Sequence, residues 1–92
     1  MPIVKVSPAF KRSFKRYLSK HPELKVQIAE IITQLELDPR ATSLKTHKLR
    51  GEWQGYLACS AGYDLRIVFE FIENKPEDEI LLIDIGTHDD VY

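Results

Sequence analysis

The stretch Gly62-Tyr-Asp-Leu-Arg-Ile-Val-Phe-Glu-Phe71 is rich in aromatic and β-branched residues, and its apolar side chains recur at every second position, which predicts a β-strand. Successive side chains of a strand point to opposite faces. We expect one face to be buried, and it carries Tyr63, Leu65, Ile67, Phe69 and Phe71. The other face carries Asp64 and Arg66, about 7 Å apart along the strand. Folding does not require such a pair, whereas a site that handles a phosphate group would use both.

Two helices are predicted before this strand. Ser7-Pro8 is a typical helix start, because the serine hydroxyl caps free N–H groups and proline fits the first helical position. This helix should end near His21. A second helix should run from Glu23 to about Leu37 and end at Asp38-Pro39, because the residue before a proline avoids the helical conformation. The short connection predicts an antiparallel helical hairpin on one face of a sheet.

Three further strands are predicted, at Pro2 to Val6, Trp53 to Ser60 and Glu79 to Ile85. A polar, basic loop over residues 40–52 follows the second helix. The order β-α-α-β-β-β predicts an α+β fold, with the helical hairpin packed on a mainly antiparallel sheet of about four strands. The other sheet face, with Asp64 and Arg66, should be open. Residues 1–92 should form a single domain, because so short a chain has no room for two cores.

Composition favours a globular protein of the cytoplasm. The chain is 43% hydrophobic and 29% charged, and no apolar run approaches the ~20 residues that span a bilayer. The N-terminus has no hydrophobic region of the kind found in signal peptides. The one cysteine, Cys59, forms no internal disulfide and is expected to be a small core residue in a reducing compartment.

The net charge of −1 conceals an asymmetry between the two parts of the chain. Residues 1–54 carry eleven Lys or Arg against five Asp or Glu, whereas residues 55–92 carry two against nine. A basic half on a nearly neutral chain indicates a local surface for anions, or two solvated helices that are rich in lysine. The charge pattern alone favours the solvated helices.

No general catalytic motif is present: the chain has no P-loop, no GxGxxG, no zinc-ligand spacing and no nucleophile elbow. No metal or other cofactor is therefore expected. The polar residues that remain as candidates lie in the C-terminal half, and they are His47, Lys48, Arg50, Asp64, Arg66, His88 and Tyr92. Cleavage of RNA without a metal requires a base, an acid and a cation for the charge on the phosphate. Histidine supplies either proton-transfer role, and arginine supplies the cation.

Three segments together resemble the RelE/ParE toxin superfamily, and most closely its YafQ-type branch. They are His47-Lys-Leu-Arg-Gly-Glu-Trp-Gln-Gly-Tyr56, Gly62-Tyr-Asp-Leu-Arg-Ile-Val-Phe69 and Asp84-Ile-Gly-Thr-His-Asp-Asp-Val-Tyr92. The resemblance covers essentially the whole chain. It implies a RelE-like fold and a ribosome-dependent endoribonuclease that cuts messenger RNA in the decoding site. It also implies a cognate antitoxin as partner, in a heterotetramer or a larger complex.

The resemblance also implies roles for individual residues. His47, Asp64, Arg66 and His88 match catalytic positions, and Tyr92 matches a C-terminal aromatic residue that holds the substrate. We add Lys48 and Arg50 as binding residues for the RNA. Three positions depart from the YafQ-type pattern: Ser60 stands in place of a histidine, Leu65 in place of a tryptophan, and Asp84 in place of an arginine. The division of acid and base roles between Asp64 and the two histidines stays open.

Two alternatives belong to the same superfamily. ParE-like members have a similar fold, inhibit DNA gyrase and lack the nuclease residues. His47, Asp64 and His88 together argue against this alternative. The other alternative is a catalytically inactive member that serves as an antitoxin-binding module.

Overall fold

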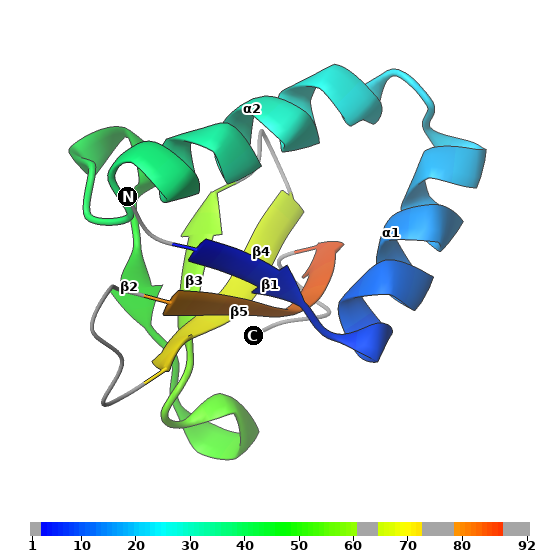
Figure 1. Ribbon diagram of the computed structural model, residues 1–92. Coiled ribbons are helices and arrows are strands. Elements are labelled where there is room, and N and C mark those ends of the chain that lie inside the picture. The colour runs from blue at the N-terminus through cyan, green and yellow to red at the C-terminus, as the bar shows by residue number, and fades with distance from the viewer. Residues whose placement is uncertain (1–2, 61–64, 73–78, 88–92) are drawn as a thin grey trace.

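The computed structural model describes residues 3–60, 65–72 and 79–87. The elements, in chain order, are β1 (Ile3–Val6), α1 (Pro8–Lys20), α2 (Leu24–Leu37), the 3-10 turn η1 (Thr42–Leu44), β2 (His47–Lys48), the 3-10 turn η2 (Gly51–Trp53), β3 (Leu57–Ser60), β4 (Leu65–Ile72) and β5 (Glu79–Thr87). Figure 1 shows both helices bordering one twisted sheet. No helix among these residues is long and apolar enough to cross a membrane.

The sheet is mixed and has five strands in the order β1-β5-β4-β3-β2. The strand β1 pairs with β5 in parallel, and the other three pairings are antiparallel. The α+β class and the mainly antiparallel sheet are therefore confirmed. The strand beyond the expected four is β2, which lies inside the segment 40–52 that was predicted to be a loop.

The helix start predicted at Ser7 is confirmed. The Ser7 Oγ accepts a hydrogen bond from the Phe10 N–H (3.1 Å) and donates one to the Ile83 carbonyl oxygen (2.7 Å), so the cap also ties the helix to β5. α1 ends at Lys20 and α2 begins at Leu24, close to the predicted bounds. The two helices meet at the turn and then diverge, so the hairpin is open rather than closely packed along its length (Figure 1).

The main core lies between the sheet and the helices. The predicted buried face of β4 is confirmed, since Leu65, Ile67 and Phe69 are buried and Phe71 is partly buried against them. Tyr63 lies outside the described residues. The helices contribute side chains from both apolar stripes to this core: Phe10, Ile28 and Leu35 are buried, and Phe14 and Ile31 pack around them.

The opposite face of the sheet is partly covered, which corrects the expectation that it is open. A second, smaller core of Leu49, Ala58 and Val68 is buried there. Trp53 and Tyr56 pack against it, and their rings meet edge to face with centroids 6.1 Å apart. The prediction that a strand begins at Trp53 is wrong: η2 ends there, and β3 begins only at Leu57. Trp53 packs against the second core at the end of η2 instead of opening a strand.

A β-bulge displaces the pattern of β5. Val68 pairs with Asp84 and Phe69 pairs with Leu82, so Ile83 is an extra residue without its own partner on β4. Ile83 packs against the second core, whereas Ile85 is buried in the main core. The bulge turns Asp84 toward α1, where its Oδ1 accepts a hydrogen bond of 2.6 Å from the Ser13 hydroxyl.

Candidate active site

Arg66 lies in β4 on the sheet face that points away from the helices. It pairs with Ser60 of β3 on one side and with Gly86 of β5 on the other. The guanidinium is partly buried and donates a hydrogen bond of 2.9 Å to the Leu65 carbonyl oxygen. Gly86 has no side chain and Ser60 has a short one. Arg66 is therefore the only large side chain among these three paired residues.

His47 is positioned by the compact segment that follows α2. The Asp38 carboxylate accepts a hydrogen bond from the Arg40 N–H (3.1 Å), and η1 then inserts Leu44, which is fully buried in the main core. Lys45 adopts a left-handed conformation with φ of 51°, which ends η1 and redirects the chain into β2. His47 then pairs with Ala58 of β3.

The hydrogen bonding of His47 favours one ring tautomer. The Nδ1 atom lies 3.1 Å from the Lys45 carbonyl oxygen. Because a carbonyl oxygen only accepts, Nδ1 carries the hydrogen in this contact, and Nε2 of the neutral ring then carries the lone pair. This is the tautomer that a general base uses. The side chain is exposed at the edge of the sheet.

His47 and Arg66 share one face of the sheet. Directly opposed residues of antiparallel strands point to the same side, so the row His47, Ala58, Val68 and the row Ser60, Arg66 are neighbours. The two rows are two residues apart along β3, and β2 is two strands from β4. From the ~3.4 Å rise and the ~4.8 Å strand spacing, the two Cα atoms are about 12 Å apart. His47 and Arg66 thus lie on the same face of the sheet, two strands apart.

Lys48 and Arg50 lie elsewhere. Lys48 pairs with Leu57, a residue of the main core, so its side chain leaves the sheet on the face opposite to His47. Both cations line a cavity of about 810 Å³ at the end of the β2–β3–β4 ladder, together with Tyr56 and Phe71. The Arg40 guanidinium lies over the Phe71 ring at 4.6 Å. The two predicted binding residues therefore do not join the row of Arg66.

Three predicted site residues, Asp64, His88 and Tyr92, lie outside the described residues. Two of them are sequence neighbours of a described pair: Leu65 opens β4 and pairs with Thr87, which closes β5. Asp64 directly precedes the first of these residues, and His88 directly follows the second.

Comparison with known proteins identifies the family. The model of the bacterial YafQ toxins of type II toxin–antitoxin systems matches residues 3–92. The chain belongs to the YafQ toxin family. The match extends over essentially the whole chain, as the three sequence segments had indicated.

Solved structures agree with this fold. YafQ from Escherichia coli strain BL21(DE3) superposes with a TM-score of 0.78 at 18% identity, covering 100% of this chain and 99% of that one. The E. coli DinJ–YafQ complex gives a TM-score of 0.76 at 19% identity, with coverage of 100% and 99%. A metal-bound toxin from Helicobacter pylori gives 0.77 at 22% identity, with full coverage of both chains. No curated protein sequence gave a match.

Asp84 is the residue whose role sequence reasoning missed. The toxin has this aspartate where the YafQ-type pattern has an arginine, and the structure shows the carboxylate engaged with Ser13 of α1 and with the Ile85 N–H (2.8 Å). Asp84 therefore ties the first helix to β5. A signal for this role existed in the polar Ser13, which stands within the otherwise apolar stripe of α1 and is buried.

Cys59 is a core residue, as predicted. It is fully buried in β3, and burial raises the pKa of its thiol to about 12. A backbone hydrogen bond with Ile67 and the charge of Arg66 oppose this rise in pKa only in part. A thiol of this kind is not a nucleophile at neutral pH.

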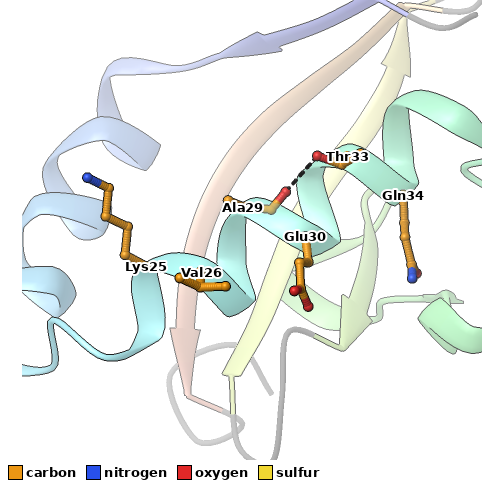
Figure 2. Close-up of a pocket in the computed structure, with 6 residues that line it drawn as sticks. All are labelled: Lys25, Val26, Ala29, Glu30, Thr33 and Gln34. Carbon is orange, nitrogen blue, oxygen red and sulfur yellow. Dashed lines mark hydrogen bonds between the residues drawn. The ribbon is translucent and has the colours of Figure 1, made fainter.

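A second cavity, of about 690 Å³, lies on the outer surface of α2 (Figure 2). Its lining residues come from this one helix, and the Thr33 hydroxyl is occupied by the Ala29 carbonyl oxygen at 2.9 Å. The lining holds no histidine and no arginine. Among residues 3–60, 65–72 and 79–87, no group of three or more His, Cys, Asp or Glu side chains is arranged to hold a metal ion.

Proposed function

We propose that this toxin is a ribosome-dependent endoribonuclease that cuts messenger RNA. Membership of the YafQ family supports a toxin of a type II toxin–antitoxin system. The observation that carries the nuclease proposal is the common sheet face of His47 and Arg66. A base and a phosphate-binding cation on one face meet two of the three requirements for cleavage without a metal.

Chain connectivity supports His88 as the third group. His88 is one peptide bond from Thr87, and Asp64 is one peptide bond from Leu65, its partner across the sheet. The proposal takes His88, which follows β5 in the sequence, as the acid, and Asp64, which precedes β4 in the sequence, as a second candidate base.

The proposed reaction is an attack of the 2′-oxygen on the neighbouring phosphorus. His47 or Asp64 takes the 2′-hydroxyl proton as the new P–O bond forms. His88 gives a proton to the 5′-oxygen as the old P–O bond breaks, and a 2′,3′-cyclic phosphate remains. Arg66 binds the phosphate oxygens, on which negative charge builds up in the transition state. In this proposal Tyr92 holds the substrate, and Lys48 and Arg50 contact the RNA only where it passes the cavity at the end of the β2–β3–β4 ladder, away from the row of Arg66.

The test is a translation reaction with purified ribosomes and a defined message, read by primer extension. We expect discrete cuts within codons, and a rate reduced by roughly 10²–10⁴-fold in His88→Ala, the range typical of a lost general acid. EDTA at a fixed magnesium level that keeps the ribosomes intact should leave the rate unchanged. Cuts by His88→Ala at the wild-type rate would defeat the proposal. Breaks in DNA that depend on gyrase would indicate a ParE-like activity instead.

We further propose that a cognate antitoxin neutralises this chain in the cytoplasm. The DinJ–YafQ complex, in which a similar chain is bound by an antitoxin, supports this partner. An acidic chain that folds on binding would cover the site at an ordering cost of ~2–5 kcal/mol. Co-expression with the product of the neighbouring reading frame should yield a stable complex that cuts no message. A chain that is harmless alone and captures no such product would indicate an inactive module.

A further inference from the structure

The cavity of about 810 Å³ at the end of the β2–β3–β4 ladder combines cations with aromatic rings. Lys48 and Arg50 line it, and both side chains are exposed. Tyr56 and Phe71 also line it and are half-buried. Among the described residues, no Asp or Glu belongs to the lining. The cavity therefore favours an anionic ligand that also has a flat apolar part.

The loop between β2 and β3 gives this cavity a fixed shape. The Leu49 N–H donates a hydrogen bond of 3.1 Å to the Tyr56 carbonyl oxygen, which closes the loop at its base. Leu49 is also buried in the second core, so the base of the loop is anchored. Within the loop, Gly51 and Gly55 have φ of 67° and 96°, a conformation that glycine adopts without strain. A site that is formed before binding loses less entropy when a ligand enters.

The ring of Phe71 is held in a layered arrangement. The Arg40 guanidinium lies over it at 4.6 Å from the centroid, and the Phe69 ring meets it edge to face with centroids 5.8 Å apart. A planar group that enters the cavity would continue this layering. Gln54 is exposed and lines the same cavity, and its amide both donates and accepts hydrogen bonds. An amide of this kind pairs with the edge of a nucleic-acid base.

We propose that this cavity binds one unpaired nucleotide. Its phosphate lies at Lys48 and Arg50. Its base stacks on the ring of Phe71 or Tyr56, and Gln54 meets the edge of the base. An acidic peptide would satisfy the two cations, but rings, an arginine plane and an amide are the contacts that unpaired bases receive in proteins. The nucleotide comes either from the substrate RNA or from solution. The first source rests on the proposed nuclease function, and the second does not.

The cavity is separate from the site of cleavage. Leu57, which lines it, is three residues along β3 from Ser60, the partner of Arg66, and this is about 10 Å. Lys48 leaves the sheet on the face opposite to His47. A nucleotide of the substrate in this cavity therefore lies beyond the nucleotide that is cut. It governs affinity and sequence preference, and not the chemical step.

The first experiment titrates the toxin with the four nucleoside 5′-monophosphates and with inorganic phosphate, followed by amide chemical shifts. Shifts should concentrate in the lining of the cavity, and phosphate should bind about tenfold more weakly or less, because it has no base to stack. Lys48→Gln/Arg50→Gln should weaken nucleotide binding by roughly tenfold or more, since two charge-assisted contacts are lost. The control Lys11→Gln/Lys25→Gln removes two exposed cations outside the cavity and should stay within about twofold of wild type.

The amide of Gln54 is tested by the choice among bases. Wild type should bind one monophosphate about fivefold more tightly than the weakest, and Gln54→Ala should bring the four within about twofold of each other. Gln27→Ala, at an exposed position of α2, is the matched control and should keep the preference. Equal binding of phosphate and nucleotides, or unchanged affinity in Lys48→Gln/Arg50→Gln, would overturn the proposal. A loss of antitoxin binding in that variant with nucleotide binding intact would do so as well, and would assign the cavity to an acidic peptide.

A second experiment distinguishes the two sources of the nucleotide. Its probe is a trinucleotide of deoxyribonucleotides, which lacks the 2′-hydroxyl that cleavage requires. For substrate RNA, the trinucleotide should bind about tenfold more tightly than the monophosphate, because further bases add contacts. Gln54→Ala should then change the positions at which a message is cut. Equal affinity of the two probes with unchanged cut positions would assign the cavity to a free nucleotide. A toxin that binds the nucleotide in this cavity but cuts no message would refute the nuclease and leave the nucleotide site standing.

Discussion

The hydrogen bond between Ser13 and Asp84 holds α1 against β5, and its removal should measurably lower the free energy of unfolding of the toxin. Ser13 is only 8% exposed, and its hydroxyl lies 2.6 Å from the Asp84 Oδ1. Hydrogen bonds to a charged group contribute ~1.5–3 kcal/mol to stability, and because Asp84 is partly exposed we take the lower end of this range. Asp84→Ala also removes the acceptor of the Ile85 N–H, so its total cost should be ~2–3 kcal/mol.

Single and double variants together separate the energy of the Ser13–Asp84 hydrogen bond from the other effects of each substitution. Ser13→Ala should cost ~1 kcal/mol, because the carboxylate that remains can still reach water. A cycle of Ser13→Ala, Asp84→Ala and the double variant should give a coupling energy of about 1 kcal/mol. The free energy of unfolding is measured by urea titration. At ~4–8 °C per kcal/mol for a domain of this size, the Tm of Asp84→Ala should fall by about 8–24 °C.

Ser19→Ala is the matched control on the same helix. Its hydroxyl donates a hydrogen bond of 3.0 Å to the Arg16 carbonyl oxygen at an exposed position, so the change should stay within ~0.5 kcal/mol. A coupling energy below ~0.3 kcal/mol between Ser13 and Asp84, or a Ser19 effect as large as that of Ser13, would refute the reasoning.

Four further predictions concern the core and the site. The single thiol, Cys59, should react with a thiol reagent at pH 8 roughly a hundredfold or more slowly in the native toxin than in denaturant, and rapid native labelling would contradict its burial. Because its pKa is raised to about 12, the stability that it contributes is present below pH 9 and is lost as pH rises toward 12, which urea titrations at pH 8 and pH 10 should show. Leu44→Ala should lower the free energy of unfolding by ~2–5 kcal/mol, because the Leu44 side chain is fully buried. It should also lower the cleavage rate, because Leu44 holds the segment that carries His47. A loss of unfolding free energy below ~1 kcal/mol by urea titration would show that η1 is not anchored by Leu44. Arg66→Ala should slow cleavage about a hundredfold and evenly across codons, with partial recovery in Arg66→Lys, as read by primer extension; a change confined to certain codons would show base recognition instead of phosphate binding.

Periodic segments made most of the fold predictable. Leu65, Ile67 and Phe69 alternate with polar or smaller residues, and the predicted buried face of β4 is confirmed. Ser7 caps the helix and Pro8 occupies its first position, so the predicted start of α1 is confirmed as well. The segment between α2 and β3 has no period. Two short 3-10 turns and a two-residue strand depend on tertiary contacts, such as the burial of Leu44, that no local pattern records.

The candidate site was less predictable because register decides which side chains meet. Lys48 and His47 are sequence neighbours, yet pairing with Leu57 and Ala58 sends them to opposite faces of the sheet. The bulge at Ile83 has the same kind of effect, since it turns Asp84 toward α1. Neither feature follows from residue types alone, whereas the row of Ser60 and Arg66 follows once the β3–β4 register is known.

The departure at Asp84 bears on how the toxin would bind a phosphate. An arginine at this position would supply a cation from β5, but here the position holds a carboxylate that is committed to α1. Arg66 is a cation on the neighbouring strand, one residue from the paired ends of β4 and β5, and its partner on β5 is Gly86. We propose that Arg66 takes over the phosphate-binding role; its Cα lies one strand across and two residues along from that of Asp84, about 8 Å away. Gly86, the residue of β5 that pairs with Arg66, has no side chain that would block an approach of the guanidinium to a phosphate from that side.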